Sequence, residues 1–122
     1  MLFRSHQLGR TGEVIAARHL EKKGYTIIER SWRSKHLELD LVAIKGDFLI
    51  IVEVKTRSKQ QHADPDDTIG RKKLRALFDA AEQYIERNKI VLEVRYDLIT
   101  IIHHGDTHTI EHLEEAFYPF MQ

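Results

Sequence analysis

Glu53 and Lys55 stand two residues apart, directly after the apolar run Phe48–Val52. This run favours a strand, and residues two apart in a strand point to the same side, so the carboxylate and the ammonium are predicted to project together. Asp40 lies on the preceding apolar segment. A tight connection at residues 46–47 would join the two segments into a hairpin and bring Asp40 roughly opposite Glu53. Two carboxylates and one ammonium are therefore expected on one patch of sheet.

This trio has the chemistry that phosphodiester hydrolysis needs. Mg²⁺ neutralises phosphate charge and activates water, and it prefers oxygen ligands, commonly one or two carboxylates. Asp40 and Glu53 would supply those oxygens, with the Val54 carbonyl as a further candidate. Lys55 would hold or deprotonate the attacking water, or stabilise the charged phosphate. The competing interpretation is an exposed Glu–Lys pair, a frequent feature that stabilises a protein by only about 0–1 kcal/mol.

Further acids near the trio are candidates for the same site. Gly12 favours close packing of a helix start against the sheet, which would bring Glu13 near Asp40. The alternative for Glu13 is a solvated position on the helix surface. Glu38 shares a strand face with Asp40, and it is either a more distant member of the site or a second surface acid.

A set of cations flanks a polar segment over residues 56–67. The candidates for contact with nucleic-acid phosphates are Arg57, Arg71, Lys72 and Lys73. A solvated helix start would also account for them, although cations in a first helical turn oppose the helix dipole. Residues 1–61 carry a net charge of +5 and residues 62–122 one of −5. This asymmetry either marks a basic face for a polyanion or averages out on folding.

Length and composition narrow the class of protein. The 122 residues fit one domain over residues 1–122, and 42% hydrophobic residues can form its core. The absence of cysteine excludes disulfides and thiolate chemistry and fits a reducing cytosol. No apolar run reaches the ~18 residues of a membrane span, and the first residues lack a signal-peptide stretch. We expect a soluble, cytoplasmic protein with no membrane partner.

The elements that must position these residues follow in the order helix, three strands, helix, two strands, which predicts a mixed α/β sheet with helices against it. The predicted helices cover residues 8–23 and 66 or 67 to about 87. The predicted strands cover residues 25–32, 38–44, 48–55, 90–102 and 107–112, with residues 56–67 as a loop.

Individual residues refine this scheme. Gly24 sits where a glycine caps the end of the first helix, Asp66 or Asp67 would cap the second, and Asn88 would close it. Phe48–Val52 is apolar on both faces, as in a central strand covered by helices. The strand before it would place its alternating apolar residues on one face: Leu39, Leu41 and Ala43.

A longer series of residues surrounds the trio. The chain reads, in order, Gly9-Arg-Thr-Gly12-Glu13, Arg30-Ser-Trp-Arg33, Glu38-Leu-Asp40-Leu-Val-Ala43, Val52-Glu-Val-Lys-Thr-Arg57, Lys72 or Lys73, Arg95-Tyr-Asp97 and Glu115-Ala-Phe117. This series resembles the YraN-like family of small bacterial proteins. That family is itself similar to archaeal Holliday junction resolvases and to the PD-(D/E)XK restriction-endonuclease-like nucleases. The resemblance covers nearly the whole chain.

The resemblance implies a restriction-endonuclease-like fold, in which a central mixed sheet is flanked by helices. It implies metal ligands at Asp40 and Glu53, a catalytic lysine at Lys55, a further catalytic acid at Glu13, and Mg²⁺ or Mn²⁺ as the cofactor. One departure concerns Leu37, because the family usually has glycine before the Glu-x-Asp stretch. A glycine there would permit a bulge or a close backbone approach.

Three classes of function follow from this sequence. The first is a metal-dependent endonuclease that acts on DNA, with branched or junction DNA among its candidate substrates. The second is a non-catalytic nucleic-acid-binding or adaptor module on the same fold, and a purely structural interaction protein is a third. The intact Asp40, Glu53 and Lys55 set favours the enzyme, whereas the zero net charge favours the other two. The type of nucleic acid, a protein partner and a homodimer, which resolvase-like relatives would favour, stay open.

Overall fold

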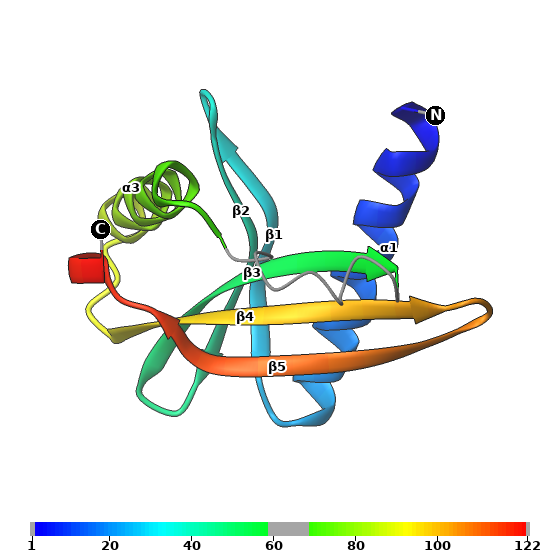
Figure 1. The fold of residues 1–122 in the computed structure, drawn as a ribbon. Coiled ribbons are helices and arrows are strands. Elements are labelled where there is room, and N and C mark those ends of the chain that lie inside the picture. Colours follow the sequence, from blue (N-terminus) through cyan, green and yellow to red (C-terminus); the bar gives the residue numbers. More distant parts are fainter. Residues whose placement is uncertain (1, 59–68, 122) are drawn as a thin grey trace.

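The computed structural model describes residues 2–58 and 69–121, with the backbone alone for residues 2–10 and 121. Helices and strands follow the predicted order (Figure 1). The elements are α1 (Leu2–Lys22), β1 (Thr26–Ser34), β2 (Leu37–Lys45), β3 (Phe48–Ser58), α3 (Arg71–Arg87), β4 (Glu93–His104), β5 (Thr107–Phe117) and the short 3-10 helix η1 (Pro119–Met121). Over these ranges, no helix is long and apolar enough to cross a membrane.

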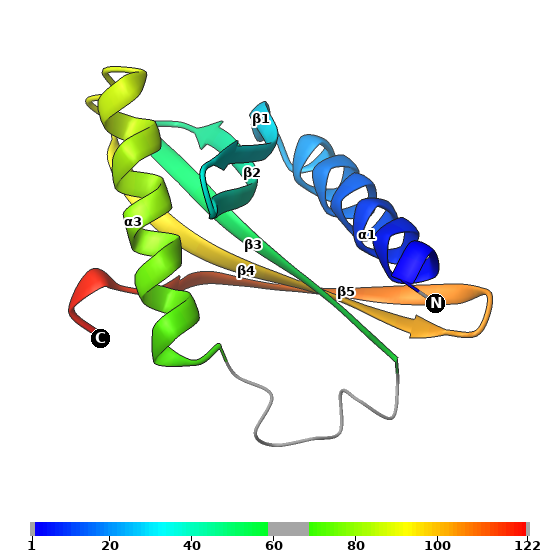
Figure 2. The ribbon, with the colours of Figure 1, turned by 90° about the horizontal axis from the view of Figure 1, so that it is seen from above.

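The five strands form one mixed sheet in the order β1-β2-β3-β4-β5. Strands β3 and β4 run parallel, and the other neighbouring pairs run antiparallel. The connection from β3 to β4 passes through α3, whereas tight turns join the antiparallel pairs. Seen from above, α1 and α3 lie on opposite sides of the sheet (Figure 2). This α/β architecture is consistent with a restriction-endonuclease-like fold.

Strand β3 is the central strand, as its doubly apolar sequence predicts. Leu49 and Ile51 belong to the hydrophobic core under α3, and Ile50 and Val52 belong to the core under α1. All four side chains are fully buried. Because β3 has a helix layer on each face, it is apolar at every position up to Glu53.

The turns around α1 and β2 confirm the predicted glycine positions. Gly24 has a φ of +89°, and the N–H of Tyr25 donates to the carbonyl of Leu20 at 3.0 Å, so α1 ends in a glycine cap. Gly46 has a φ of +58° in the two-residue turn between β2 and β3. Asn88 caps the end of α3, as expected.

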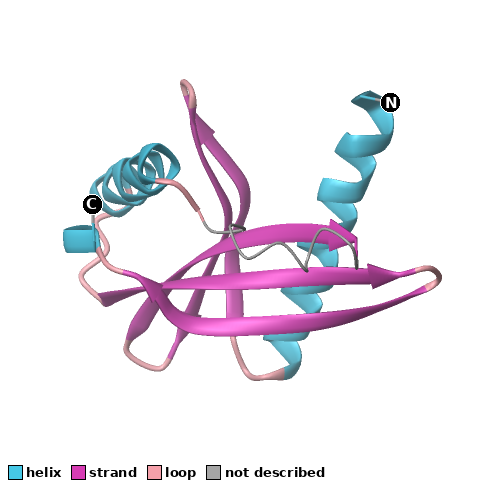
Figure 3. Cartoon of the chain, viewed as in Figure 1, coloured by secondary structure: helices cyan, strands magenta, loops and turns pink. Residues whose placement is uncertain are grey.

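Strand β2 changes the face that it presents to the helices along its length. Leu39 belongs to the core under α3, whereas Leu41 and Ala43 belong to the core under α1. The prediction that these three residues share one face is therefore wrong. The register between β1 and β2 shifts between Ile27 and Glu29, and such a bulge increases strand twist. The end of the β1–β2 hairpin accordingly rises out of the sheet (Figure 3).

Some predicted boundaries are also wrong. Strand β3 continues to Ser58, so the predicted loop does not begin at residue 56. Helix α3 begins at Arg71 with Gly70 at its N-cap and no side-chain cap bond, in place of a start at Asp66 or Asp67, which lie outside the described residues. Strand β5 ends at Phe117, five residues beyond the end predicted for it at residue 112. The strand is longer than predicted because Phe117 still pairs with Tyr96 of β4.

Candidate active site

Asp40 lies at the fork where β2 leaves β3. The register between the two strands runs from Lys45↔Phe48 to Leu41↔Val52, and β3 continues beyond it. Two residues further along β3, the N–H of Val54 donates to Asp40 Oδ2 at 2.8 Å. A side-chain carboxylate thus satisfies a backbone donor at the point where the ladder between β2 and β3 ends. The hydrogen bond also fixes the carboxylate beside Glu53.

The position of Asp40 makes its negative charge costly. Burial raises the pKa of Asp40 to about 8, with further contributions from the negative charges of Glu53 and Glu13. The Val54 N–H and the ammonium of Lys73 act in the opposite direction but do not compensate. The charged form of Asp40 is therefore disfavoured at this position, and a cation bound beside the carboxylate would relieve that cost.

Glu53 is the second acid of the site, and its side chain is 8% exposed. It extends from the α3 side of β3, because Ile51 and Leu49, two and four residues earlier, belong to the core under α3. Lys73, in the first turn of α3, approaches Glu53 Oε2 with its Nζ at 2.9 Å. The hydrogen bond with Glu53 raises the pKa of Lys73 and outweighs the opposing effect of its burial.

Lys55 follows on the same side of β3 as Glu53. Its side chain is half-buried, and burial lowers the pKa of its ammonium, as do the positive charges of Arg57 and Lys73. Glu53 acts in the opposite direction. A lysine whose pKa is lowered gives up its proton more readily than a solvated one, which suits a residue that exchanges protons with water.

Glu13 reaches the site from α1 by close packing. A Cβ on Gly12 would collide with Oγ1 of Thr56 on β3, so glycine is what allows the helix to approach the strand so closely. The Ser31 hydroxyl donates to Glu13 Oε1 at 2.6 Å. The charge of Glu13 contributes to the raised pKa of Asp40, so the two acids share one electrostatic environment. The expected role of Gly12 in packing is confirmed.

The four residues expected to act together, Glu13, Asp40, Glu53 and Lys55, thus come from α1, β2 and β3 and gather around the fork. Among the described residues, however, no group of three or more His, Asp or Glu side chains is gathered closely enough to hold a metal ion. In this structure Glu53 contacts Lys73, and Glu13 contacts Ser31. A metal held by one or two carboxylates does not require a third acid.

The cations expected to contact phosphates fall into two groups. Arg71 and Lys72 are exposed at the start of α3, and Arg57 is half-buried near the end of β3. Lys73 instead contacts Glu53, a role in the site itself that the sequence reasoning missed. The signal available in the sequence was the run of cations in the first turn of this helix. The helix dipole disfavours positive charge there, so a lysine at this position needs a negatively charged partner.

Other predicted residues have structural roles. The exposed Glu38 pairs with Arg33 at 3.4 Å. Trp32 makes an edge-to-face contact with Tyr84 at 5.4 Å between ring centroids, and Arg87 lies over its ring. Trp32 is thus partly buried against α3.

A second charged cluster lies on the α1 side of the sheet and centres on Asp97, which is fully buried. Arg95 donates two hydrogen bonds to its carboxylate, each 2.9 Å long, and the Glu115 N–H donates a third at 3.1 Å. His112 Nε2 lies 2.8 Å from Asp97 Oδ2, and Lys23 Nζ lies 3.2 Å from His112 Nδ1. Because a carboxylate only accepts and an ammonium only donates, these two contacts suit an imidazole tautomer with its proton on Nε2.

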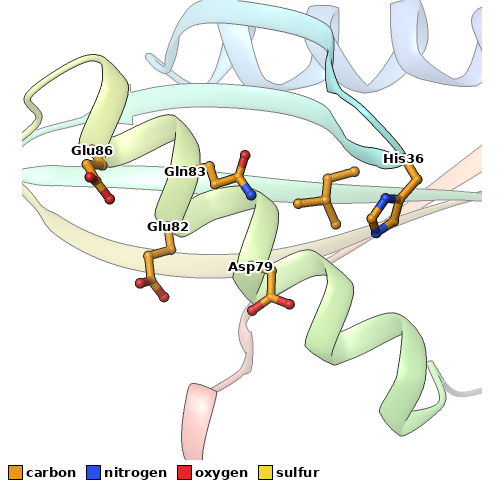
Figure 4. A pocket seen from close by; sticks show the side chains of 6 residues that line it. His36, Asp79, Glu82, Gln83 and Glu86 are labelled. Atoms are coloured by element: carbon orange, nitrogen blue, oxygen red, sulfur yellow. The ribbon is translucent and has the colours of Figure 1, made fainter.

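A cavity of about 290 Å³ lies elsewhere, between α3 and the turn that joins β1 to β2. Half of its lining residues are acids, which extend from α3 in Figure 4. The full lining consists of His36, Leu37, Asp79, Glu82, Gln83 and Glu86. Leu37, which replaces the glycine usual in the resembling family, is buried here beneath α3. Leu37 therefore fills the space between hairpin and helix on the far side of β2 from Glu13, and the acidic lining disfavours nucleic acid at this cavity.

The chain matches a family model and many known proteins. The model of the Uncharacterised protein family UPF0102 matches residues 12–101, a span that includes all four residues around the fork. A UPF0102 protein of Bacteroides thetaiotaomicron is 43% identical over 114 residues, which cover 93% of this chain and 94% of the relative. A UPF0102 protein of Flavobacterium johnsoniae is 42% identical over 119 residues, which cover 94% of this chain and 97% of the relative. One from Bacteroides fragilis is 47% identical over 112 residues, with 92% and 93% coverage.

Proposed function

We propose that this chain, which belongs to the Uncharacterised protein family UPF0102, is a metal-dependent nuclease that hydrolyses phosphodiester bonds of DNA. The observation that carries the proposal is the Asp40 carboxylate, which is fixed at the β2–β3 fork by Val54 and lies in the field of Glu53 and Glu13. Lys55 follows Glu53 on the same side of β3. Negative charge without full compensation, beside a lysine of lowered pKa, suits a metal-assisted hydrolysis.

The residues present fit Mg²⁺ or Mn²⁺. Both ions prefer oxygen donors, and Asp40 and Glu53 would hold the ion. The raised pKa of Asp40 supports this assignment, because two acids that repel each other are relieved by a cation. When bound, such an ion supplies a Lewis acid that neutralises phosphate charge and lowers the pKa of a coordinated water.

The protein's own groups would orient and activate the reactants. Lys55 would accept a proton from the attacking water through its uncharged amine, or stabilise the developing negative charge on the phosphate through its ammonium. Val54 holds Asp40 through its backbone N–H, so that the carboxylate keeps one orientation. Glu13, held by Ser31, would orient water on the α1 side of the site.

The charge near the site favours a nucleic-acid substrate. Arg71 and Lys72 are exposed at the start of α3, the same helical turn that carries Lys73 into the site. Phosphates of a bound strand would contact these side chains while one phosphodiester lies at the fork. Branched or junction DNA is included among the proposed substrates because of the resemblance to junction resolvases.

Incubation of the purified chain with labelled DNA tests the proposal. The panel comprises single strands, duplexes, forks, four-way junctions and an RNA control, each with Mg²⁺, Mn²⁺ or EDTA. We expect cleavage of at least one DNA structure with metal and none with EDTA, and loss of cleavage in Glu53→Gln. Metal-independent binding of DNA without cleavage in any condition would instead support a non-catalytic nucleic-acid-binding module.

A further inference from the structure

Lys73 and Glu53 form an ion pair whose two partners are unequally buried. The distance from Lys73 Nζ to Glu53 Oε2 is 2.9 Å, and the exposed fraction of the side chain is 62% for Lys73 and 8% for Glu53. The carboxylate is therefore fixed inside the site, whereas the lysine reaches in from solvent. Lys73 can withdraw without leaving a cavity in the core, because its long stem is mostly hydrated.

The ammonium of Lys73 also lies in the field of further acids around the fork, namely Asp40 and Glu38. It is thus placed where a cation relieves the repulsion among these carboxylates. A divalent ion bound by Asp40 and Glu53 needs the same carboxylate oxygens and carries twice the charge. Lysine and metal ion cannot both hold Glu53 Oε2 at full strength, since each would repel the other there.

We propose that Lys73 is the internal counter-ion of the Asp40–Glu53 pair and that a divalent metal displaces its ammonium from Glu53. This inference rests on the proposed metal site. The displaced lysine remains at the start of α3 beside the exposed Arg71 and Lys72, where a nucleic-acid phosphate is its next partner. Metal binding and nucleic-acid binding would then reinforce each other, because the metal ion releases the Lys73 ammonium and a phosphate of the nucleic acid pairs with it.

The proposal is tested by titrating Mn²⁺ into the full chain, without nucleic acid, in an isothermal titration calorimeter. Lys73→Ala removes the competing ammonium and should tighten Mn²⁺ binding about three- to tenfold, the scale expected for loss of one partly exposed ion pair. Lys73→Arg keeps the charge and should bind Mn²⁺ like the wild type. Lys72→Ala, a matched change one residue away, should also leave affinity unaltered.

A second readout follows melting temperature. In EDTA, Lys73→Ala should melt below the wild type because two acids lose their counter-ion, and saturating Mn²⁺ should reverse this order or remove the difference.

Equal Mn²⁺ affinity in the wild type and Lys73→Ala, with binding abolished by Glu53→Gln, would overturn the role of Lys73 and leave the metal site standing. Weaker binding in Lys73→Ala would show that the lysine supports the metal site, which also overturns the proposal. Absence of Mn²⁺ binding in the wild type and in Lys73→Ala would overturn the metal site together with it.

Discussion

The carboxylate of Asp40 accepts the backbone N–H of Val54 at 2.8 Å, at the step where β2 and β3 stop pairing through their backbones. One side chain thus connects two diverging strands and stands beside Glu53. This geometry explains how an acid can be both fixed and poorly neutralised. Asp40 therefore stabilises the fork through its hydrogen bond with Val54, but its acidic group lowers the free energy of unfolding. Both effects can be measured.

Asp40→Asn should stabilise the metal-free protein at neutral pH. Asparagine keeps an oxygen that accepts the Val54 N–H but does not ionise, so the folded protein no longer holds an acid whose charge is disfavoured by burial, by Glu53 and by Glu13. We expect a gain of about 1–2 kcal/mol in the free energy of unfolding, measured by urea denaturation in EDTA. The same variant should lose the rise in melting temperature that Mn²⁺ gives the wild type. Equal metal stabilisation of the two proteins would exclude Asp40 as a ligand.

The pH dependence of this gain has a defined sign. The pKa of Asp40 is raised from 3.8 to about 8 in the folded protein, so the folded state binds a proton more tightly than the unfolded state does. The wild type therefore loses stability as the pH rises from about 4 to about 8, and Asp40→Asn does not share this loss. The stability difference should grow over this interval and become small near pH 4. Metal affinity of the wild type should rise over the same interval, because the ion competes with the proton on Asp40.

Loss of Asp97 should destabilise the fold strongly. Burial opposes ionisation of Asp97, but hydrogen bonds from His112, Arg95 and the Glu115 N–H outweigh it and hold the pKa of Asp97 below its ordinary value. Asp97→Asn leaves the nearly buried Arg95 without the carboxylate that accepts two of its hydrogen bonds, and it should lower the free energy of unfolding by about 3–5 kcal/mol. Urea denaturation measures the change. Glu114→Gln is the control, because this exposed acid also pairs with Arg95, and it should cost about 1 kcal/mol or less.

The same network predicts the response to acid. A carboxylate with a lowered pKa stabilises the folded protein above the pKa it has when unfolded, about 3.9, and this contribution disappears as the pH falls through the folded value. Unfolding below about pH 4 should therefore be steeper in the wild type than in Asp97→Asn. Parallel acid-unfolding curves for the two proteins would show that Asp97 is not a source of the acid sensitivity.

Gly12→Ala should reveal how closely α1 approaches β3. Alanine favours a helix over glycine by up to about 1 kcal/mol, but its Cβ would collide with Thr56 Oγ1, and a β-branched side chain has little freedom to turn away. We expect Gly12→Ala to destabilise the wild type by about 1 kcal/mol and to be neutral or stabilising in a Thr56→Ala background. A double-mutant cycle in urea measures the coupling. Additive effects would mean that the contact is not limiting.

Sequence patterns were sufficient for the order of elements and for the two acids on neighbouring strands. The apolar run Phe48–Val52 could only be a covered central strand, and Gly46 could only favour a tight turn, so the relation between Asp40 and Glu53 followed. The change of face between Leu39 and Leu41 of β2 could not be predicted, because no glycine or proline marks this part of the strand.

The remaining differences depend on tertiary contacts. The ion pair of Lys73 with Glu53 is set by where α3 begins, and no side-chain cap marks that start at Gly70. The network around Asp97 joins residues just after α1 to strands β4 and β5. These two strands lie far from α1 in the sequence. Arg95 and Asp97 share one face of a strand, but nothing in the pattern indicates that His112 comes to meet them.

Lys55 provides the most direct test of the proposed nuclease. Its role is in the reaction rather than in binding, so Lys55→Ala should fold, bind Mn²⁺ and hold DNA nearly as the wild type does. The measurement is single-turnover cleavage, with excess protein and Mn²⁺, of the DNA structure that the wild type cuts best. The proposed mechanism predicts a rate lower by about two to three orders of magnitude for Lys55→Ala, the scale of losing one proton-transfer or electrostatic group. A Lys55→Ala protein that cleaves as fast as the wild type would contradict it and would place the cleavage outside the Asp40, Glu53 and Lys55 site.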